Sequence, residues 1–360
     1  MTQGPTSPVT LSAVAKYAGV STTTVSRVLN HKGEISEETR RKVFEAIEAL
    51  GYRPSLVAQG LRTKASRLIG LMMPEILSPL FTEIAMGVEV ESSQAGYTTV
   101  HTNTFYIPER EKSGLHYLLD RYVDAVVCYS PTLPQEELIP LLNQVGSCVV
   151  INLPIPNPAV GELRVDNYQG MRLAIEHLIE RGARKIAYFA PSTSSWNSRE
   201  REKAFLQVTQ EAGLPFDPRQ NLNFERDSIP EDQQGWDPSY LFIPESAIVM
   251  GEWAGRRFLD TFTDLDAVIA FNDLCAIGII RELANAGKKV PDDIAVLGFD
   301  NWIGGKKYMP SLTSLGVTTV DIGRQAARMV IDNLEKHTPL SKNNLAFNII
   351  PRESTMGIIK

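Results

Sequence analysis

The chain has 360 residues, which is too long for one ordinary domain, so we expect two or three. Its apolar fraction of 43% is normal for a globular protein, and it has neither an apolar run approaching ~18 residues nor a charged start followed by an apolar stretch, which argues against a transmembrane helix and a secretory signal. The net charge of −6, taken over the whole chain, argues against a nucleic-acid partner.

After a polar arm at residues 1–8, which is predicted to be disordered, residues 10–30 read TLSAVAKYAGVSTTTVSRVLN and predict two short helices joined by a tight turn. Gly19 stands where the turn needs a residue that tolerates positive φ, and Ser21 can cap a second helix over residues 22–29. The inward positions are Leu11, Val14, Ala15, Ala18, Val25, Val28 and Leu29. Helix, glycine-containing turn and helix form the DNA-reading helix-turn-helix arrangement, although two packed core helices would give the same pattern.

A third helix is predicted to complete a small head. Ser36 is its expected N-cap, and Glu37 and Glu38 occupy the first turn, where the helix dipole favours acidic side chains. Gly51 is expected to end it. Its inward positions are Val43, Ala46, Ile47 and Leu50. The three helices predict a helix-turn-helix headpiece over residues 9–53.

The charge is distributed unevenly between this head and the rest of the chain. Residues 1–66 hold nine lysines and arginines and five glutamates, a net charge of +4, whereas the remaining residues carry −10. A small basic head on an acidic body is typical of a protein that contacts phosphates at one end only. Chance asymmetry is the alternative interpretation.

The connector after the head reads YRPSLVAQGLRTKAS (52–66). Pro54 fixes a turn, and a short helix is predicted from Ser55 to about Thr63. Gly60 weakens that helix by roughly 1 kcal/mol relative to alanine, and a single short helix is marginal in water. We therefore expect the connector to fold only against a partner or DNA, with a plain linker as the alternative.

From Arg67 onward, short apolar runs alternate with amphipathic stretches. We predict strands at residues 68–73, 98–103, 124–129, 148–152, 185–190, 266–271 and 293–299. We predict helices at residues 81–95, 109–120, 168–181, 199–212, 247–262 and 273–286. This alternation indicates parallel sheets with helices on both faces. The repeats are too many for one open sheet of usual size, so we predict two Rossmann-like lobes with a ligand at the carboxyl ends of the strands.

Residues 10–30, the connector and RLIGLMMP (67–74) together resemble the LacI/GalR family of bacterial transcription regulators. In the body the resemblance is carried by RVDNYQGMRLAIEHLIERGARKIAYFA (164–190), DAVIAFNDLCAIG (266–278), VPDDIAVLGFDN (290–301), MPSLTSLGV (309–317) and PRESTMG (351–357). It spans the chain from about Val9 to about Gly357. It is very specific, because head, hinge and body motifs occur in the family's order.

The resemblance implies an α/β effector domain over residues 67–360, similar to a type I periplasmic sugar-binding protein. Its first lobe would hold about 67–165 and 319–346, and its second about 166–318 and 347–360. The resemblance also implies that residues 54–66 form a hinge helix and that two copies, one per subunit, pack in the DNA minor groove. Leu61 stands at the position of the leucine that is wedged into a base step.

The predicted DNA contacts lie on the head and the hinge. Thr22, Thr23 and Arg27 are the predicted base readers, since threonine can contact either base type and arginine can donate two bonds to guanine. The start of the first helix at Leu11 is expected to contact phosphate, as are Ser21 and Ser26, whereas Tyr17 and Asn30 could do either. Thr24 is expected to pack or to bond to backbone. The full set is Leu11, Tyr17, Ser21, Thr22, Thr23, Ser26, Arg27, Asn30 and Leu61.

The predicted effector site collects polar residues that follow strands. By family position, Arg201, Asn272 and Asp300 match effector contacts, and such an Asp, Arg and Asn set suits a polyhydroxy ligand. Ser78, Phe81 and Tyr129 match pocket-lining positions of the first lobe, with ordinary loop and core as the alternative. We expect Asp273 to cap its helix and residues 166–167 to be structural. Many family members carry Asp-Arg where this chain has Asn152–Leu153, which removes a charge pair from the lobe junction.

Neither a metal nor a cofactor is predicted. The three cysteines, Cys128, Cys148 and Cys275, lie in separate apolar runs and are expected to be buried free thiols in a reducing compartment. The five histidines show no ligand spacing with one another or with cysteine; they are His31, His101, His116, His177 and His337.

The sequence therefore predicts a cytoplasmic, nucleoid-associated transcriptional regulator. It would repress a carbohydrate-utilisation operon as a homodimer on a palindromic double-stranded operator, under control of a sugar or sugar derivative. A heptad-repeat tail is absent, which favours a dimer over a tetramer. The alternatives are a regulator with a nucleobase-type corepressor, a cytoplasmic or transport receptor, and a dehydrogenase. No G-x-G-x-x-G follows the first strand, so we expect neither dehydrogenase nor other enzyme activity, and no membrane partner.

Overall fold

The computed structural model of the chain describes residues 9–29, 33–52, 65–191, 195–224 and 244–356. The chain divides into two compact units, Met1–Ser66 and Arg67–Lys360, and each is described by itself below. Within the described ranges, no helix is both long enough and apolar enough to cross a membrane.

The first unit is the three-helix head. Its helices are α1 (Leu11–Ala18), α2 (Thr22–Leu29) and α3 (Glu37–Leu50). Gly19 ends α1 with a φ of 66°, and the Ser21 hydroxyl accepts from the Thr24 N–H at 3.0 Å, so the turn and the cap are as predicted. Ser36 caps α3 in the same way through the Thr39 N–H. The shared core is Val14, Ala15, Val25, Val28, Val43 and Ala46.

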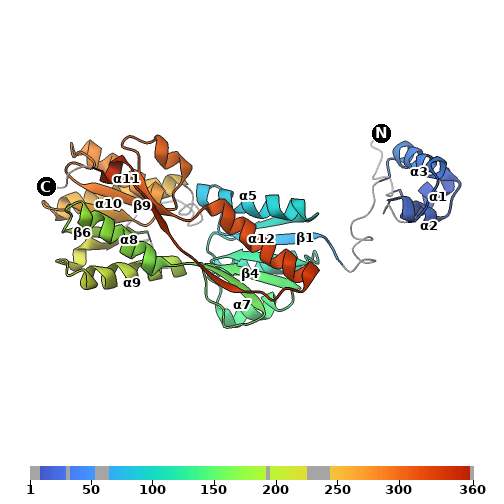
Figure 1. Cartoon of the computed structure of the whole chain (residues 1–360), viewed down its shortest axis with the longest axis horizontal. Helices are drawn as coiled ribbons and strands as arrows, with labels where there is room; N and C mark the ends of the chain where they lie inside the picture. The colour runs from blue at the N-terminus through green and yellow to red at the C-terminus, as the bar shows by residue number, and fades with distance from the viewer. Residues whose placement is uncertain (1–8, 30–32, 53–64, 192–194, 225–243, 357–360) are drawn as a thin grey trace. The chain divides into compact units, whose positions relative to one another are not determined.

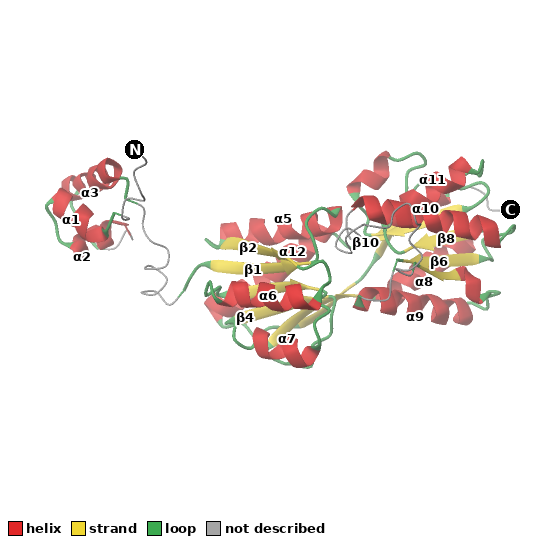
Figure 2. Cartoon of the chain, turned by 180° about the vertical axis from the view of Figure 1, so that it is seen from behind, coloured by secondary structure: helices red, strands yellow, loops and turns green. Residues whose placement is uncertain are grey.

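The second unit contains two six-stranded sheets, each covered by helices on both faces (Figures 1 and 2). In the first lobe, all strands are parallel, and their spatial order is β11 (Lys342–Leu345), β5 (Val160–Val165), β4 (Ser147–Ile151), β3 (Ala125–Tyr129), β1 (Leu68–Met73) and β2 (Thr98–Asn103). Its helices are α5 (Pro79–Gln94), α6 (Pro108–Leu119), α7 (Gln135–Leu142) and α12 (Thr319–Lys336). Helices α5 and α12 share one apolar cluster with the sheet, and α6 and α7 share another.

The second lobe repeats this plan. Its strand order is β12 (Asn348–Ile350), β10 (Thr313–Gly316), β9 (Ala295–Phe299), β8 (Ala267–Ala270), β6 (Ile186–Ala190) and β7 (Asn221–Asn223), and only the β10–β12 pair is antiparallel. Its helices are α8 (Asn167–Glu180), α9 (Trp196–Glu211), α10 (Pro244–Thr261) and α11 (Asp273–Asn285). Short 3₁₀ turns are η1 (Pro218–Gln220), η5 (Ile303–Lys307) and η6 (Glu353–Thr355). The predicted fold class is therefore confirmed.

The chain passes between the lobes three times, because β5, α12 and β11 belong to the first lobe whereas α8, β10 and β12 belong to the second (Figure 1). The crossings lie between β5 and α8, between β10 and α12, and between β11 and β12. Three chain crossings therefore connect the two lobes.

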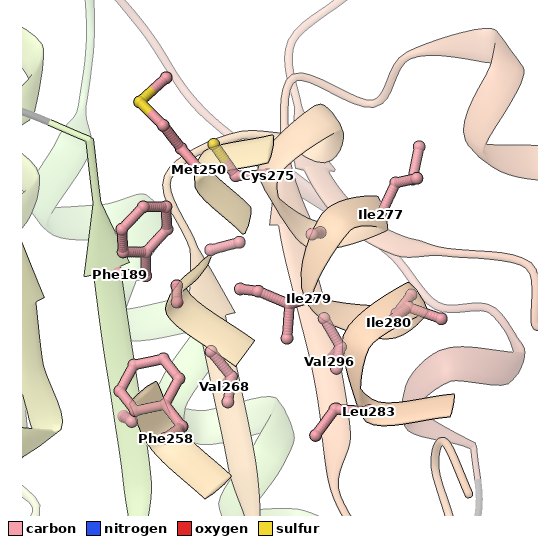
Figure 3. Packing of buried hydrophobic residues seen from close by; sticks show 14 of the residues in the cluster. Phe189, Met250, Phe258, Val268, Cys275, Ile277, Ile279, Ile280, Leu283 and Val296 are labelled. Atoms are coloured by element: carbon pink, nitrogen blue, oxygen red, sulfur yellow. The ribbon is translucent and has the colours of Figure 1, made fainter. Parts of the chain in front are cut away.

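The central strands are buried along their whole length, as expected for parallel strands covered on both faces. In the second lobe, α10 and α11 cover one face of the sheet, and Figure 3 shows Val268, Val296 and Phe189 of the strands beside Ile279 and Phe258 of the helices. All three cysteines are buried and unbridged.

In both lobes, the two helices on one face touch through glycine. On α11, a Cβ at Gly278 would lie 2.8 Å from the Glu252 nitrogen and closer still to the Ile248 carbonyl oxygen on α10. On α12, a Cβ at Gly323 would lie 2.8 Å from the Val88 nitrogen and closer still to the Ile84 carbonyl oxygen on α5. Only glycine allows two backbones to approach so closely. These helix pairs therefore pack backbone against backbone.

Candidate functional site

The exposed side of α2 carries the predicted base readers. Thr22, Thr23 and Arg27 are exposed at one side of the helix, while Val25 and Val28 are fully buried on the other. Tyr17, at the end of α1, is 62% exposed, which is unusual for an aromatic residue in so small a domain. The head therefore presents hydroxyl, guanidinium and phenol groups on a surface that its own core does not require.

The other predicted DNA contacts differ in what the structure leaves available. The Leu11 side chain is half-buried and packs against the core of the head, so only the backbone at the start of α1 could meet a phosphate there. The Ser21 hydroxyl caps α2 by accepting from the Thr24 N–H, and it also bonds to the Thr24 hydroxyl at 2.9 Å. Thr24 is therefore engaged with the cap. Ser26 is half-buried on α2. Asn30 and Leu61 lie outside the described residues.

A second polar cluster lies between the two lobes, where the carboxyl ends of the parallel strands meet. Tyr129 ends β3 of the first lobe, Asp300 follows β9 of the second, and Arg201 is on α9, the helix that follows β6. The charge of Asp300 raises the pKa of Tyr129 and that of Arg201 lowers it, which indicates that the three side chains lie near one another. Ligands of open α/β sheets bind at this edge.

Arg201 is held in place by its own lobe. It is 5% exposed, donates from Nε to the Asn167 Oδ1 at 3.0 Å, and donates from Nη1 to the Phe271 carbonyl oxygen at 2.5 Å. Its guanidinium lies 4.2 Å from the centre of the Phe299 ring and 5.0 Å from that of Phe271, within range for cation–π attraction. A buried cation fixed on neutral acceptors and aromatic faces forms a rigid wall for the site.

Asp300 has the opposite character. It has a φ of 98°, and its backbone N–H donates to the Leu315 carbonyl oxygen at 2.7 Å, which fixes its place after β9. Within the described ranges, no group donates a hydrogen bond to its carboxylate. Burial raises the pKa of Asp300 to about 6, although the charge of Arg201 acts to lower it. A half-buried carboxylate without donors is a ready acceptor for ligand hydroxyls.

The neighbouring Asn272 and Asp273 do not have the roles that the sequence suggests. Asn272 caps α11, because its side-chain oxygen accepts from the Cys275 N–H at 2.8 Å, so its amide nitrogen is the part left for a ligand. The prediction that Asp273 caps the helix is wrong. Asp273 is buried and accepts from the Trp302 N–H and from the Ser314 hydroxyl, each at 2.6 Å. It thereby fixes the loop that carries Asp300.

In the first lobe, Phe81 and Tyr129 lie together at the end of the sheet. Their rings meet edge to face with centres 5.0 Å apart, and both side chains are buried. The Tyr129 hydroxyl accepts from the Asn152 amide at 3.1 Å, and burial raises its pKa to about 12. Ser78 begins α5, and its N–H donates to the buried Glu75 carboxylate at 2.8 Å. At the position where many family members carry an Asp-Arg charge pair, Asn152 therefore makes a neutral hydrogen bond to Tyr129.

Three more residues complete the junction: Asn197 and Trp196, which the sequence did not single out, and Asn167, which was expected to be structural. Asn197 of α9 acts to lower the pKa of Tyr129 of the other lobe, and it accepts from the Asn167 amide at 3.0 Å. Trp196, beside it, packs against the apolar cluster of the first lobe. Asn167 is also the acceptor that orients Arg201. These contacts connect distant parts of the chain, so no local sequence pattern predicts them. They dock the start of α9 onto the first lobe.

The described side chains of this site are suited to binding a ligand. The described residues contain no group of three or more His, Cys, Asp or Glu that could hold a metal ion. The site instead offers a carboxylate, amides, phenols and aromatic faces, drawn from both lobes. Such a set suits a small polyhydroxy molecule that touches both lobes at once.

Comparison with known families covers nearly the whole chain. Residues 10–55 match the model of bacterial regulatory proteins, lacI family. Residues 66–232 match the periplasmic binding proteins and sugar binding domain of the LacI family, and residues 175–355 match a periplasmic binding protein-like domain. The first match covers the head, and the other two, which overlap at residues 175–232, together cover the two lobes.

Curated relatives are similar over almost their full length. The ribose operon repressor of Halalkalibacterium halodurans is 34% identical over 97% of both chains. The transcriptional regulator RegA of Clostridium saccharobutylicum is 30% identical over 95% of this chain and 98% of its own. The transcriptional repressor PurR of Actinobacillus pleuropneumoniae is 31% identical over 91% of both.

Solved structures agree with the fold. The lac repressor dimer bound to operator and the anti-inducer ONPF has a TM-score of 0.83 with 24% identity, covering 98% of this chain and 100% of that chain. A complex of the transcriptional regulator CelR with cellobiose has a TM-score of 0.66 with 29% identity, covering 96% and 99%.

Proposed function

We propose that this chain represses a carbohydrate-utilisation operon by binding operator DNA through its head. The premise is that the chain belongs to the lacI family of bacterial regulatory proteins. The observation that carries the proposal is the face of α2: three polar side chains are exposed on a capped helix-turn-helix that is joined to a two-lobed binding domain. In a helix-turn-helix protein, this helix enters the major groove and its first residues meet base edges.

The protein acts as a homodimer on a palindromic site, one half-site for each head. Similar proteins support this reading: one solved relative is a lac repressor dimer on operator. We propose that the connector at residues 54–66, of which 54–64 lie outside the described residues, acts as the hinge and contacts the minor groove together with its copy from the second subunit. The site of action is the nucleoid in the cytoplasm, and the chain catalyses no reaction.

A sugar or sugar derivative between the lobes is the effector. Its support is the similarity to a ribose operon repressor and to a cellobiose-bound regulator, together with an acceptor-rich site at Asp300 and Tyr129. A sugar effector is favoured over a nucleobase-type corepressor. The ligand touches both lobes, so it has a different affinity for each lobe arrangement and shifts their populations. The first lobes of the dimer then separate or align, and the hinge helices melt or form.

Arg27→Ala is expected to weaken operator binding by roughly 5- to 150-fold, because a base-reading arginine contributes about 1–3 kcal/mol of discrimination. The measurement is fluorescence anisotropy on a palindromic duplex selected from a randomised pool. Arg41→Ala is the matched control: it removes the same charge from α3, where Arg41 is 71% exposed. Equal losses for the two variants, at every salt concentration, would mean that Arg27 makes only a general electrostatic contribution.

Leu61→Ala is expected to weaken operator binding while leaving effector affinity nearly intact, since a wedged leucine contributes only when the hinge is in the groove. Anisotropy gives the first quantity and calorimetry the second. If the substitution lowers both affinities alike, Leu61 belongs to the body rather than to the hinge.

A further inference from the structure

Acceptor oxygens and negative charge dominate the site between the lobes. Three carboxylates from different elements act on this site: Glu75 after β1, Glu83 on α5 and Asp300 after β9. Burial raises the pKa of Tyr106 well above its usual range, and negative charges that include Glu75 and Asp300 raise it further. Glu83 likewise acts to raise the pKa of Asp300.

Two of the three carboxylates already have donors. Glu75 is 1% exposed and accepts from the backbone N–H groups of residues 77 and 78. Glu83 accepts from the Thr319 hydroxyl of α12. Asp300 alone, of these three in the described structure, accepts no hydrogen bond. The capacity of the site to receive donors is therefore concentrated at Asp300.

Positive charge is scarce by comparison. In the described structure, Arg201 is the cation whose charge reaches Asp300. Two of its donors are bonded to Asn167 and to the Phe271 carbonyl, and aromatic rings lie against its face. Recognition of a phosphate or carboxylate favours an arginine that presents paired donors to the anion. Arg201 gives two of its five N–H donors to its own lobe, so it presents a reduced set of donors to a ligand.

Building on the proposed function, we infer that the effector is an uncharged polyhydroxy compound and that its phosphorylated or carboxylated counterparts are rejected. Adjacent hydroxyls of a neutral sugar donate to Asp300, and its ring carbons pack against the Phe81 and Tyr129 side. A phosphate or carboxylate placed there would instead meet the desolvated Asp300 carboxylate, to which no described residue donates a hydrogen bond, and like charges at close range in a half-buried site repel.

The test compares matched pairs on the full-length protein by thermal shift, followed by calorimetry. The probes are D-ribose with D-ribose 5-phosphate, D-glucose with D-gluconate and D-glucose 6-phosphate, and cellobiose with cellobionate. We expect at least one neutral member to raise the Tm and to bind about 30-fold or more tightly than its charged counterpart. The inference is overturned if a charged member binds as tightly as its neutral partner, or if no neutral member binds.

A variant assigns the preference to Asp300. Asp300→Asn keeps one acceptor but removes the charge, so affinity for the neutral sugar should fall by roughly 10- to 100-fold, as expected for loss of a hydrogen bond to a charged group, while affinity for the anion should not fall. Asp264→Asn is the control, because Asp264 is 71% exposed and pairs with Lys185 on the surface of the same lobe. Unchanged neutral-sugar affinity in Asp300→Asn would remove Asp300 from the explanation. The wild-type comparison stands even if this variant does not fold.

Operator binding by the ligand-free protein is measured in the same buffer. Loss of the ligand preference with operator binding intact refutes this inference alone. Absence of operator binding with the preference intact refutes the regulator and leaves a neutral-sugar receptor.

Discussion

Arg201→Ala is expected to abolish the response to effector while leaving operator affinity near that of the unaltered protein. The substitution removes a buried guanidinium, so the Asn167 side-chain oxygen and the Phe271 carbonyl lose their donor, and a space opens beside the Phe299 ring. Hydrogen bonds to charged groups contribute about 1.5–3 kcal/mol each, so effector affinity should fall by roughly 100-fold or more. The head has its own core and caps, so DNA binding should persist.

Operator anisotropy, titrated with the effector identified by thermal shift, measures both quantities in one experiment. Arg201→Lys keeps the charge but loses the planar group and its fixed donors, so it should recover little of the response. Arg219→Ala is the matched control, since Arg219 is 65% exposed and pairs with Asp217 on the second lobe. A normal induction curve from Arg201→Ala would exclude Arg201 from the effector site.

The head could be predicted almost completely from the sequence because its determinants are local. Gly19, Ser21 and Ser36 act on residues within three or four positions, and the apolar spacing fixes which face is buried. The same holds for the central strands of both sheets, whose continuous apolar runs were sufficient. All seven predicted runs form strands.

Five strands, β5, β7, β10, β11 and β12, escaped prediction, and two of them are short and polar. β7 and β11 read NLN and KNNL and have partly or fully exposed residues, so no run of apolar residues marks them. β12 exists only because Ile350 pairs antiparallel with Ser314 across a long sequence separation. The positions of these strands depend on contacts between segments that are distant in the sequence, which a local pattern does not predict.

The effector site likewise has features that the sequence predicts and features that it does not. That polar residues follow β8 and β9 is visible in the sequence, but the division of roles between Asn272 and Asp273 is not. Both can cap a helix, and the outcome depends on Trp302 and Ser314, which reach Asp273 only in the folded lobe. The contacts of Asn197 and Trp196 with the first lobe are also non-local. Residue type predicted a polar site, and tertiary contacts decided which groups remain open to a ligand.

Gly278→Ala is expected to destabilise the body by about 3 kcal/mol or more, at the upper end of the cost of overpacking. The new Cβ would lie 2.8 Å from the Glu252 nitrogen and 2.9 Å from the Gly251 Cα, and these are backbone atoms that no rotamer change can move. The two helices would have to separate, which would loosen the contacts that Ile279 and Phe258 make beneath them (Figure 3). For a domain of this size, the Tm should fall by roughly 6–12 °C.

Differential scanning calorimetry of the ligand-free protein measures this shift. Gly114→Ala on α6 is the matched control: its Cβ would meet only the Thr102 side chain, at 3.2 Å or more, and the gain in helix propensity of about 1 kcal/mol offsets that contact. Gly323→Ala on α12 should repeat the loss in the first lobe, because its Cβ would meet the backbone of Ile84 and Val88 in the same way. If Gly278→Ala and Gly323→Ala have the same Tm as Gly114→Ala, then the helices of each pair can separate without cost, and close backbone contact does not stabilise either lobe.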